Sequence, residues 1–325
     1  DDEILEWQIG IAPDEWTGLK DHMKNQGWVD NTLIECNLAR ENKKTYDFFR
    51  NRVMFPIENA TGRICGFGSR SLPWEMASNK NLPKYINSPE SKIYDKSTIL
   101  YGFTRARKEI AKQGKCYVVE GYTDLISMHT ADLTNSVAVC GTSLTEEHIR
   151  IIKKYCNTIN LFLDGDGPGQ NAMIRKCELI LKAGMHAMIT IIPEEHDPDS
   201  YLKALALDKE QKAEPADIIR NKENSFLSWI ANKKLEGTSD DPLARHEALK
   251  EIVRLICLIP DRSMQDLIIE DLVKKYKLQR KTIRGMVEQA SKEQSKKGVT
   301  QTETSKNNEK PPNGGISKKL DFFKV

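Results

Sequence analysis

The middle of the chain alternates short apolar runs with stretches whose apolar residues recur at helical spacing. The apolar runs predict four strands, CYVVE (116–120), SVAVC (136–140), TINLFLD (158–164) and AMITII (187–192). The predicted helices fill the intervals and begin near residues 123, 145 and 169. This alternation predicts a parallel sheet covered by helices, an α/β arrangement in which functional residues gather at the carboxyl ends of the strands.

The first third of the chain has a mixed α+β pattern. The runs RVMFPI (52–57) and RICGFGSR (63–70) flank a turn at 59–62, which predicts a hairpin. The segment 72–91 contains three prolines and is expected to be a loop. The chain starts without Met inside a segment that already looks structured, so we expect that an upstream part is missing.

The last part of the chain changes pattern twice. Residues 206–290 carry apolar residues at helical spacing and no convincing strand, which predicts a helical bundle. Residues 291–325 are rich in Lys, Gln, Ser, Thr and Asn, which is typical of a disordered tail. The tail ends in the small apolar cluster LDFF (320–323), which could serve as a docking peptide or be an inert terminus.

Composition and charge narrow the class of protein. A hydrophobic fraction of 39% and a charged fraction of 30% are those of an ordinary soluble protein. The seven cysteines are scattered without a CxxC pair, which indicates reduced, cytosolic thiols and argues against zinc within this fragment. Between Arg40 and Lys115 there are sixteen Lys and Arg against seven Asp and Glu. That excess suits a polyanionic partner, although a solvated basic surface would have the same composition.

Acidic residues follow three of the four predicted strands. Glu120 ends the first strand and Asp124 lies four residues on, Asp164 and Asp166 end the third, and Asp197 and Asp199 follow the fourth. Carboxylates gathered at one edge of a sheet repel one another unless a cation neutralises them, and hard oxygen ligands suit Mg²⁺ or Mn²⁺. One such pair alone is more often a turn or a helix cap. Repetition at three strand ends favours a metal site.

These acidic motifs resemble the Toprim domain of bacterial DnaG-type DNA primases. The resemblance rests on EGYTD (120–124), FLDGDGPGQNA (162–172) and HDPDSYL (196–202). Two upstream blocks, 46–72 and 83–103, extend it and are more specific, because topoisomerases, recombination mediators and some nucleases share only the Toprim acids. The resemblance implies a basic α+β subdomain in 1–114, a Toprim catalytic domain in 115–205, a helical bundle in 206–290 and a tail in 291–325.

The resemblance also implies a role for each matching position. Glu120 would act in acid/base chemistry or metal binding, Asp164 and Asp166 would bind the metal, and Asp124, Asp197 and Asp199 would complete the acidic set. Five basic residues would hold template or nucleotide, namely Arg50, Arg52, Arg70, Lys84 and Lys96. Position 48, commonly basic in the family, is Phe48 here. Tyr85 and Tyr122 could stack on bases or pack in the core.

The function implied is that of a DNA primase catalytic core, which makes short RNA primers from ribonucleoside triphosphates on a single-stranded DNA template with Mg²⁺ or Mn²⁺. The alternatives are another Toprim phosphodiester enzyme, nuclease-like or topoisomerase-like, and a non-catalytic nucleic-acid-binding module. The expected location is the cytoplasm, at the nucleoid or replisome. The replicative helicase would bind through a region not evident here, and KKLDFF (318–323) loosely resembles sliding-clamp-binding motifs.

Overall fold

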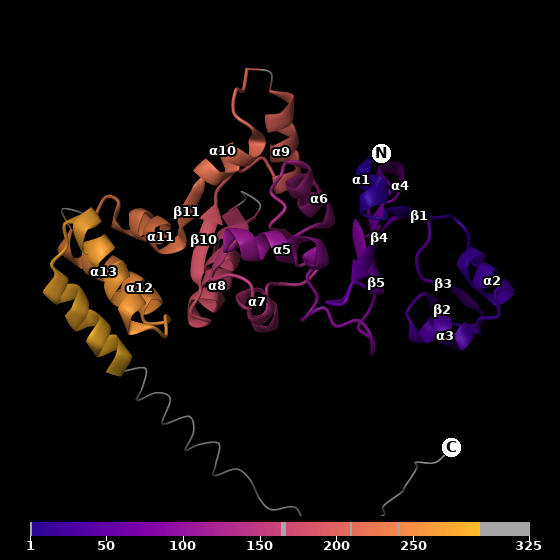
Figure 1. Ribbon diagram of the computed structural model, residues 1–325, viewed down its shortest axis with the longest axis horizontal. Coiled ribbons are helices and arrows are strands. Elements are labelled where there is room, and N and C mark those ends of the chain that lie inside the picture. Colours follow the sequence, from indigo (N-terminus) through magenta and orange to yellow (C-terminus); the bar gives the residue numbers. More distant parts are fainter. Residues whose placement is uncertain (1, 164–166, 209, 239–240, 293–325) are drawn as a thin grey trace, which may run out of the picture.

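The computed structural model describes residues 2–163, 167–208, 210–238 and 241–292, and the side chains of 167–170 are not included. Three segments follow one another along the long axis of the molecule: an N-terminal antiparallel sheet with short helices, a central sheet covered by helices, and a group of C-terminal helices (Figure 1). None of the helices in these ranges is long and apolar enough to cross a membrane.

The central sheet confirms the predicted α/β alternation. Its strands run in the order β11-β10-β9-β7-β8. The four predicted strands pair in parallel and are β7 (Lys115–Val119), β8 (Ser136–Ala138), β9 (Thr158–Phe162) and β10 (His186–Thr190). The helices between them are α6 (Tyr122–Thr130), α7 (Glu146–Lys153) and α8 (Gly167–Lys182). All strands of this parallel set therefore end at one edge, where the acidic motifs follow them.

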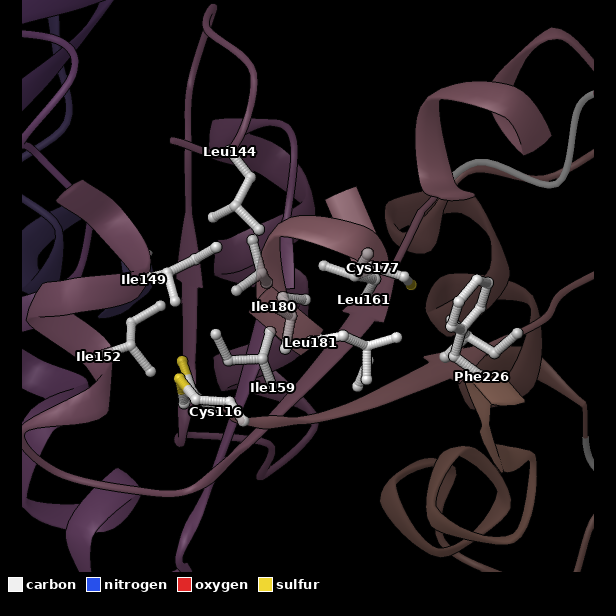
Figure 2. Packing of buried hydrophobic residues seen from close by; sticks show 14 of the residues in the cluster. Cys116, Leu144, Ile149, Ile152, Ile159, Leu161, Cys177, Ile180, Leu181 and Phe226 are labelled. Atoms are coloured by element: carbon white, nitrogen blue, oxygen red, sulfur yellow. The ribbon is translucent and has the colours of Figure 1, made fainter. Parts of the chain in front are cut away.

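The core of this layer forms between the strands and the helices α7 and α8 (Figure 2). Apolar residues of the strands meet apolar residues of both helices, and the labelled ones include Cys116, Ile159, Leu161, Ile149, Ile152, Cys177, Ile180 and Leu181. Burial of one such side chain contributes about 1.5–3 kcal/mol to folding. All seven cysteines are free thiols, and burial raises the pKa of Cys116 and Cys140, which suits packing rather than nucleophilic chemistry.

The N-terminal segment confirms the predicted hairpin. Strands β4 (Arg52–Glu58) and β5 (Ile64–Ser71) pair antiparallel within a sheet of order β1-β4-β5-β6. At the turn the side chain of Asn59 accepts hydrogen bonds from the backbone of Thr61 and Arg63, and Gly62 has φ +82°. The other elements of this segment are α1 (Asp2–Glu6), β1 (Gly10–Ala12), α2 (Gly18–Asn25), α3 (Asp30–Glu35), β2 (Ala39–Glu41), β3 (Thr45–Asp47) and α5 (Phe103–Gln113).

The prediction that 72–91 is a loop was wrong. The segment contains the helix α4 (Pro73–Ser78) and the strand β6 (Tyr85–Asn87), which pairs with the edge of β5. Pro83 and Pro89 flank β6 instead of interrupting it. Pro73 stands in the first turn of α4, where its missing N–H has no partner to lose and its fixed φ suits the helix.

The described residues that follow β10 are helical apart from one strand. The helices are α9 (Pro198–Leu207), α10 (Pro215–Asn221), α11 (Phe226–Leu235), α12 (Pro242–Ile256), α13 (Arg262–Tyr276) and a further helical stretch at 280–292. The expectation of no strand here was wrong, because β11 (Glu223–Ser225) pairs antiparallel with β10. The exposed edge of β10 supplies the partner, and the polar sequence of β11 gives no strand signal of its own. The expected tail lies outside the described residues, except that 291–292 continue the last helix.

The N-terminal sheet packs directly on the central layer through Tyr122. The ring of Tyr122 stacks on Phe55 with ring centroids 4.8 Å apart and is only 2% exposed, so Tyr122 packs in the core. Its hydroxyl donates to the Asn87 side-chain oxygen at 2.9 Å, and the Asn87 amide donates to the Cys140 carbonyl at 2.9 Å. One hydrophobic cluster thus includes residues of both sheets.

Candidate active site at the carboxyl edge of the central sheet

Glu120 follows β7 directly and presents its carboxylate at the edge of the sheet. Its side chain is 49% exposed, and its backbone carbonyl accepts a hydrogen bond from the Cys140 amide at 3.0 Å. The parallel register pairs Val118 of β7 with Leu161 of β9. The end of β9 is therefore level with Glu120, and Leu163 is the last described residue before the DxD motif. Asp164 and Asp166 themselves lie outside the described residues.

Glu120 has a cationic partner that the sequence motifs did not single out. The ammonium of Lys176, on α8, forms an ion pair with the Glu120 carboxylate, and Lys176 is only 7% exposed. The signal in the sequence was its position on the helix. Lys176 stands beside Cys177 and four residues before Ile180, on the face that the apolar residues of α8 bury.

Asp124 serves the backbone at the start of α6. Its carboxylate accepts a hydrogen bond from the Gly121 amide at 2.9 Å, and its side chain is buried. This contact closes the turn between Glu120 and α6, because Gly121 is the residue that joins them. Asp124 therefore fixes the position of Glu120 whatever further contacts its carboxylate makes.

Asp197 and Asp199 are both anchored in the structure around α9. Asp197 caps that helix, accepting a hydrogen bond from the Ser200 amide at 2.7 Å. Asp199 accepts a hydrogen bond from the Ser127 hydroxyl of α6 and pairs with Lys203 at 2.8 Å. Partial burial alone would raise the pKa of Asp197, but the hydrogen bonds from Ser200 and the positive charge of Lys84 outweigh it, so the pKa is lowered.

Replacing Asp197 separates its capping role from its charge. Asp197→Ala removes the cap acceptor and is expected to lower the free energy of unfolding by about 1 kcal/mol. Asp197→Asn keeps an acceptor and should stay within about 0.5 kcal/mol of the wild type. Because the pKa of Asp197 is lowered from its ordinary value of 3.8, the stability that the charged cap contributes is lost only as the pH falls below 3.8. Urea denaturation at neutral pH measures both variants, and equal destabilisation by Ala and Asn would contradict the capping role.

The fit of a divalent cation depends on which of these acids remains open to solvent. Among the residues that the structure describes, no three His, Cys, Asp or Glu side chains group as a ligand set. Each of the four acids has a protein partner, but Glu120, which pairs with Lys176, is still half-exposed at the edge. The carboxylate of Glu120 suits a hard cation. The two remaining acids of the expected ligand set are Asp164 and Asp166.

Two of the expected basic residues lie close to this edge. Arg70 on β5 and Lys84 flank Tyr85, with the guanidinium carbon of Arg70 5.8 Å and the Lys84 ammonium 5.7 Å from the ring centroid. The Tyr85 hydroxyl lies 3.4 Å from the Thr123 hydroxyl in the first turn of α6. A cavity of about 780 Å³ beside this contact is lined by Arg70, Thr123 and Asp199 among others, a volume within the range of ligand clefts.

Arg50 belongs to a second group of basic and aromatic side chains in the N-terminal segment. Its guanidinium carbon lies 3.8 Å from the ring centroid of Trp16, which is 64% exposed, and Arg50 donates a hydrogen bond to the Asp47 carbonyl at 2.8 Å. Phe48 stands where the resemblance leads us to expect a basic residue, and Arg40 lies 4.7 Å over its ring. A cation from β2 is therefore present at this place, so basic and aromatic groups alternate on this surface.

Arg52 and Lys96 differ in their surroundings. Arg52 is 5% exposed and donates from both terminal nitrogens to the Pro83 carbonyl, at 3.2 and 3.1 Å. Burial lowers its pKa. Arg52 therefore supports the backbone next to Lys84. Lys96 is partly exposed, and its carbonyl accepts a hydrogen bond from His148 at 3.0 Å.

Comparison with known proteins agrees with this arrangement along most of the chain. Residues 1–107 match the family model of the N-terminal domain of the DNA primase catalytic core, and residues 117–202 match the Toprim-like model. A DNA primase of Halalkalibacterium halodurans is 35% identical over 257 residues, which is 78% of this chain and 42% of the relative. The chain spans less than half the length of the curated relatives it matches.

Comparison with solved structures also finds DNA primase domains. A DNA primase domain from Pseudomonas aeruginosa superposes with a TM-score of 0.71 at 27% identity, covering 89% of this chain and 88% of that one. A DnaG primase catalytic domain bound to single-stranded DNA superposes with a TM-score of 0.71 at 28% identity, covering 86% of each chain.

The match of residues 117–202 to the Toprim-like model, over the parallel sheet whose strand β7 leads into Glu120, identifies a Toprim protein. Toprim domains occur in several classes, and the N-terminal segment decides between them, because residues 1–107 match a domain of primase catalytic cores. The chain belongs to the DnaG-type DNA primase family and carries its catalytic core.

Proposed function

We propose that this chain synthesises short RNA primers from ribonucleoside triphosphates on a single-stranded DNA template. The observation that carries the proposal is the joint presence of both parts of a primase core. The N-terminal sheet packs its basic strands against the same Toprim helix that follows Glu120. Basic side chains of the N-terminal sheet thus lie beside the helix that follows Glu120, and Arg70 lines a cavity together with Asp199.

We assign the metal to Glu120 together with Asp164 and Asp166, and Mg²⁺ or Mn²⁺ fits their oxygen chemistry. The bound cation would activate the attacking 3′-hydroxyl and stabilise the leaving pyrophosphate. The protein's own part is positioning. Asp124 holds the turn after Glu120, and Arg70 and Lys84 supply positive charge for the triphosphate. Asp197 caps α9, and Asp199 ties that helix to α6 through the Ser127 hydroxyl.

The test of this activity measures RNA synthesis and DNA cleavage in parallel. Wild-type protein is incubated with single-stranded DNA, labelled ribonucleotides and Mg²⁺ or Mn²⁺, and a parallel reaction carries end-labelled DNA. We expect template-dependent RNA products and intact DNA. Cleaved DNA without RNA synthesis would instead favour a nuclease-like Toprim enzyme, and binding without either reaction would favour a non-catalytic module.

Single-stranded DNA is expected to bind the N-terminal segment through its phosphates. The triple change Arg50→Glu, Lys84→Glu and Lys96→Glu should weaken binding at least about tenfold at moderate salt, and wild-type affinity should fall steeply as salt rises. Fluorescence anisotropy with a labelled oligonucleotide measures both effects. The matched control carries the same charge change on the C-terminal helices, at the exposed residues Lys250, Lys274 and Lys281. Equal losses in the two triple variants, or affinity that ignores salt, would contradict this interface.

The sequence alone supports our proposals for the location and the other partners. We propose the cytoplasmic replisome as the place of action, with the helicase contact made elsewhere in the full-length protein. The sliding-clamp contact is assigned to the sequence 318–323, which lies outside the described residues.

A further inference from the structure

Lys176 is a buried cation whose ion-pair partner is the acid at the centre of the candidate site. The residue is 7% exposed, and its side chain lies on the face of α8 that packs against the sheet. Its ammonium reaches the carboxylate of Glu120, which is 49% exposed. The ion pair therefore links a buried lysine of α8 to a carboxylate that is half-exposed at the edge of the sheet.

The energetics of burial explain why the two groups stay together. Removing a lysine ammonium from water is strongly unfavourable unless a partner and hydrogen bonds compensate. The Glu120 carboxylate provides that compensation for Lys176. The charge on Lys176 in turn lowers the repulsion that a carboxylate at this edge would meet from the neighbouring acidic motifs.

The same carboxylate is the one that we assign to the metal, and this creates a competition. A divalent ion bound to Glu120 would stand close to the Lys176 ammonium, and like charges at such a distance repel. The Lys176 side chain is only 8% exposed, so its ammonium has little room to move away from a cation bound at the edge of the sheet.

We propose that Lys176 is an internal counter-ion of Glu120 that holds the carboxylate in the metal-free protein and weakens the binding of divalent cations there. Lys176 is thus a positioning residue that sets how much metal the site requires. This inference rests on the proposed function in one respect, namely that Glu120 is a metal ligand.

The test measures metal binding directly, without substrate. Mn²⁺ is titrated into the folded protein by isothermal calorimetry, with thermal melting as the folding control. Lys176→Met keeps the length of the side chain and removes the charge, and it should bind Mn²⁺ roughly three- to tenfold more tightly than the wild type. Lys176→Arg keeps the charge and should bind Mn²⁺ like the wild type. Lys182→Met removes an exposed cation from the same helix and should leave the affinity unchanged.

The Glu120→Gln background shows whether the effect passes through the carboxylate. There, adding Lys176→Met should change Mn²⁺ affinity by less than about twofold, because the shared partner is gone. Unchanged or weaker Mn²⁺ binding by Lys176→Met in the wild-type background would overturn the counter-ion role while leaving primer synthesis as proposed. An absence of Mn²⁺ binding in the wild type and in Lys176→Met would contradict the metal site itself.

Discussion

Glu120→Gln is expected to lower the rate of primer synthesis at least about a hundredfold while the protein remains folded. The change keeps the shape of the side chain and removes the charge that would hold the cation. Glu120 follows β7 at the edge of the sheet and is half-exposed, so its replacement leaves the hydrophobic core intact. Primer synthesis on single-stranded DNA across a metal titration measures the rate.

The structure adds one consequence for stability to this prediction. Glu120→Gln leaves the buried Lys176 with a neutral partner, so we expect a loss of about 1–2 kcal/mol in the free energy of unfolding. The matched control is Glu147→Gln on α7, an acid that pairs with Arg150 on the exposed surface. Glu147→Gln should alter neither the rate of primer synthesis nor the free energy of unfolding. Near-normal synthesis by Glu120→Gln, or an equal loss in the control, would contradict the role of Glu120.

Gly68→Ala is expected to lower the free energy of unfolding by about 2–3 kcal/mol, although it adds only one methyl group. A Cβ at position 68 would overlap the ring of Tyr122, which is fixed between Phe55 and Asn87. The ring cannot turn away without breaking the contact between the N-terminal sheet and α6. Glycine is needed here because β5 passes directly over the tyrosine.

The control for this prediction lies in the same sheet. A methyl group added to Gly10 on β1 would have no neighbouring atom within 4 Å, and Gly10 has no positive φ, so Gly10→Ala should leave stability almost unchanged. Chemical denaturation of both variants gives the comparison. A Gly68→Ala protein as stable as Gly10→Ala would show that the two sheets are not in the close contact described.

The fold of the central layer could be predicted because its strands carry their own signal. Runs such as 116–119 and 161–163 are apolar throughout, as expected for strands buried on both faces, and amphipathic stretches separate them. β11 could not be predicted, because its three polar residues become a strand only through the free edge of β10. β6 was hidden in the same way, among prolines that lie outside the strand itself.

The candidate site was predictable in type but not in detail. The acidic motifs identified the sheet edge, and the blocks 46–72 and 83–103 distinguished a primase from other Toprim proteins. Pro198 after Asp197 and the four-residue spacing from Asp199 to Lys203 are sequence signals of a helix cap and an ion pair, but they do not show whether these carboxylates also bind a metal. Lys176 was missed since no motif contains it, although a lysine on the apolar face of a helix was a signal.

The central claim is that a cation held by the acidic edge drives template-directed RNA synthesis, and one comparison tests it most directly. Wild-type protein and the Asp164→Ala/Asp166→Ala double variant are assayed for primer synthesis on single-stranded DNA, with Mg²⁺ or Mn²⁺ titrated from excess chelator upward. Thermal melting confirms that both are folded. The account predicts metal-dependent primers from the wild type and a loss of orders of magnitude in the double variant at every metal concentration. Near-normal synthesis by the double variant, or full wild-type activity in excess chelator, would contradict it.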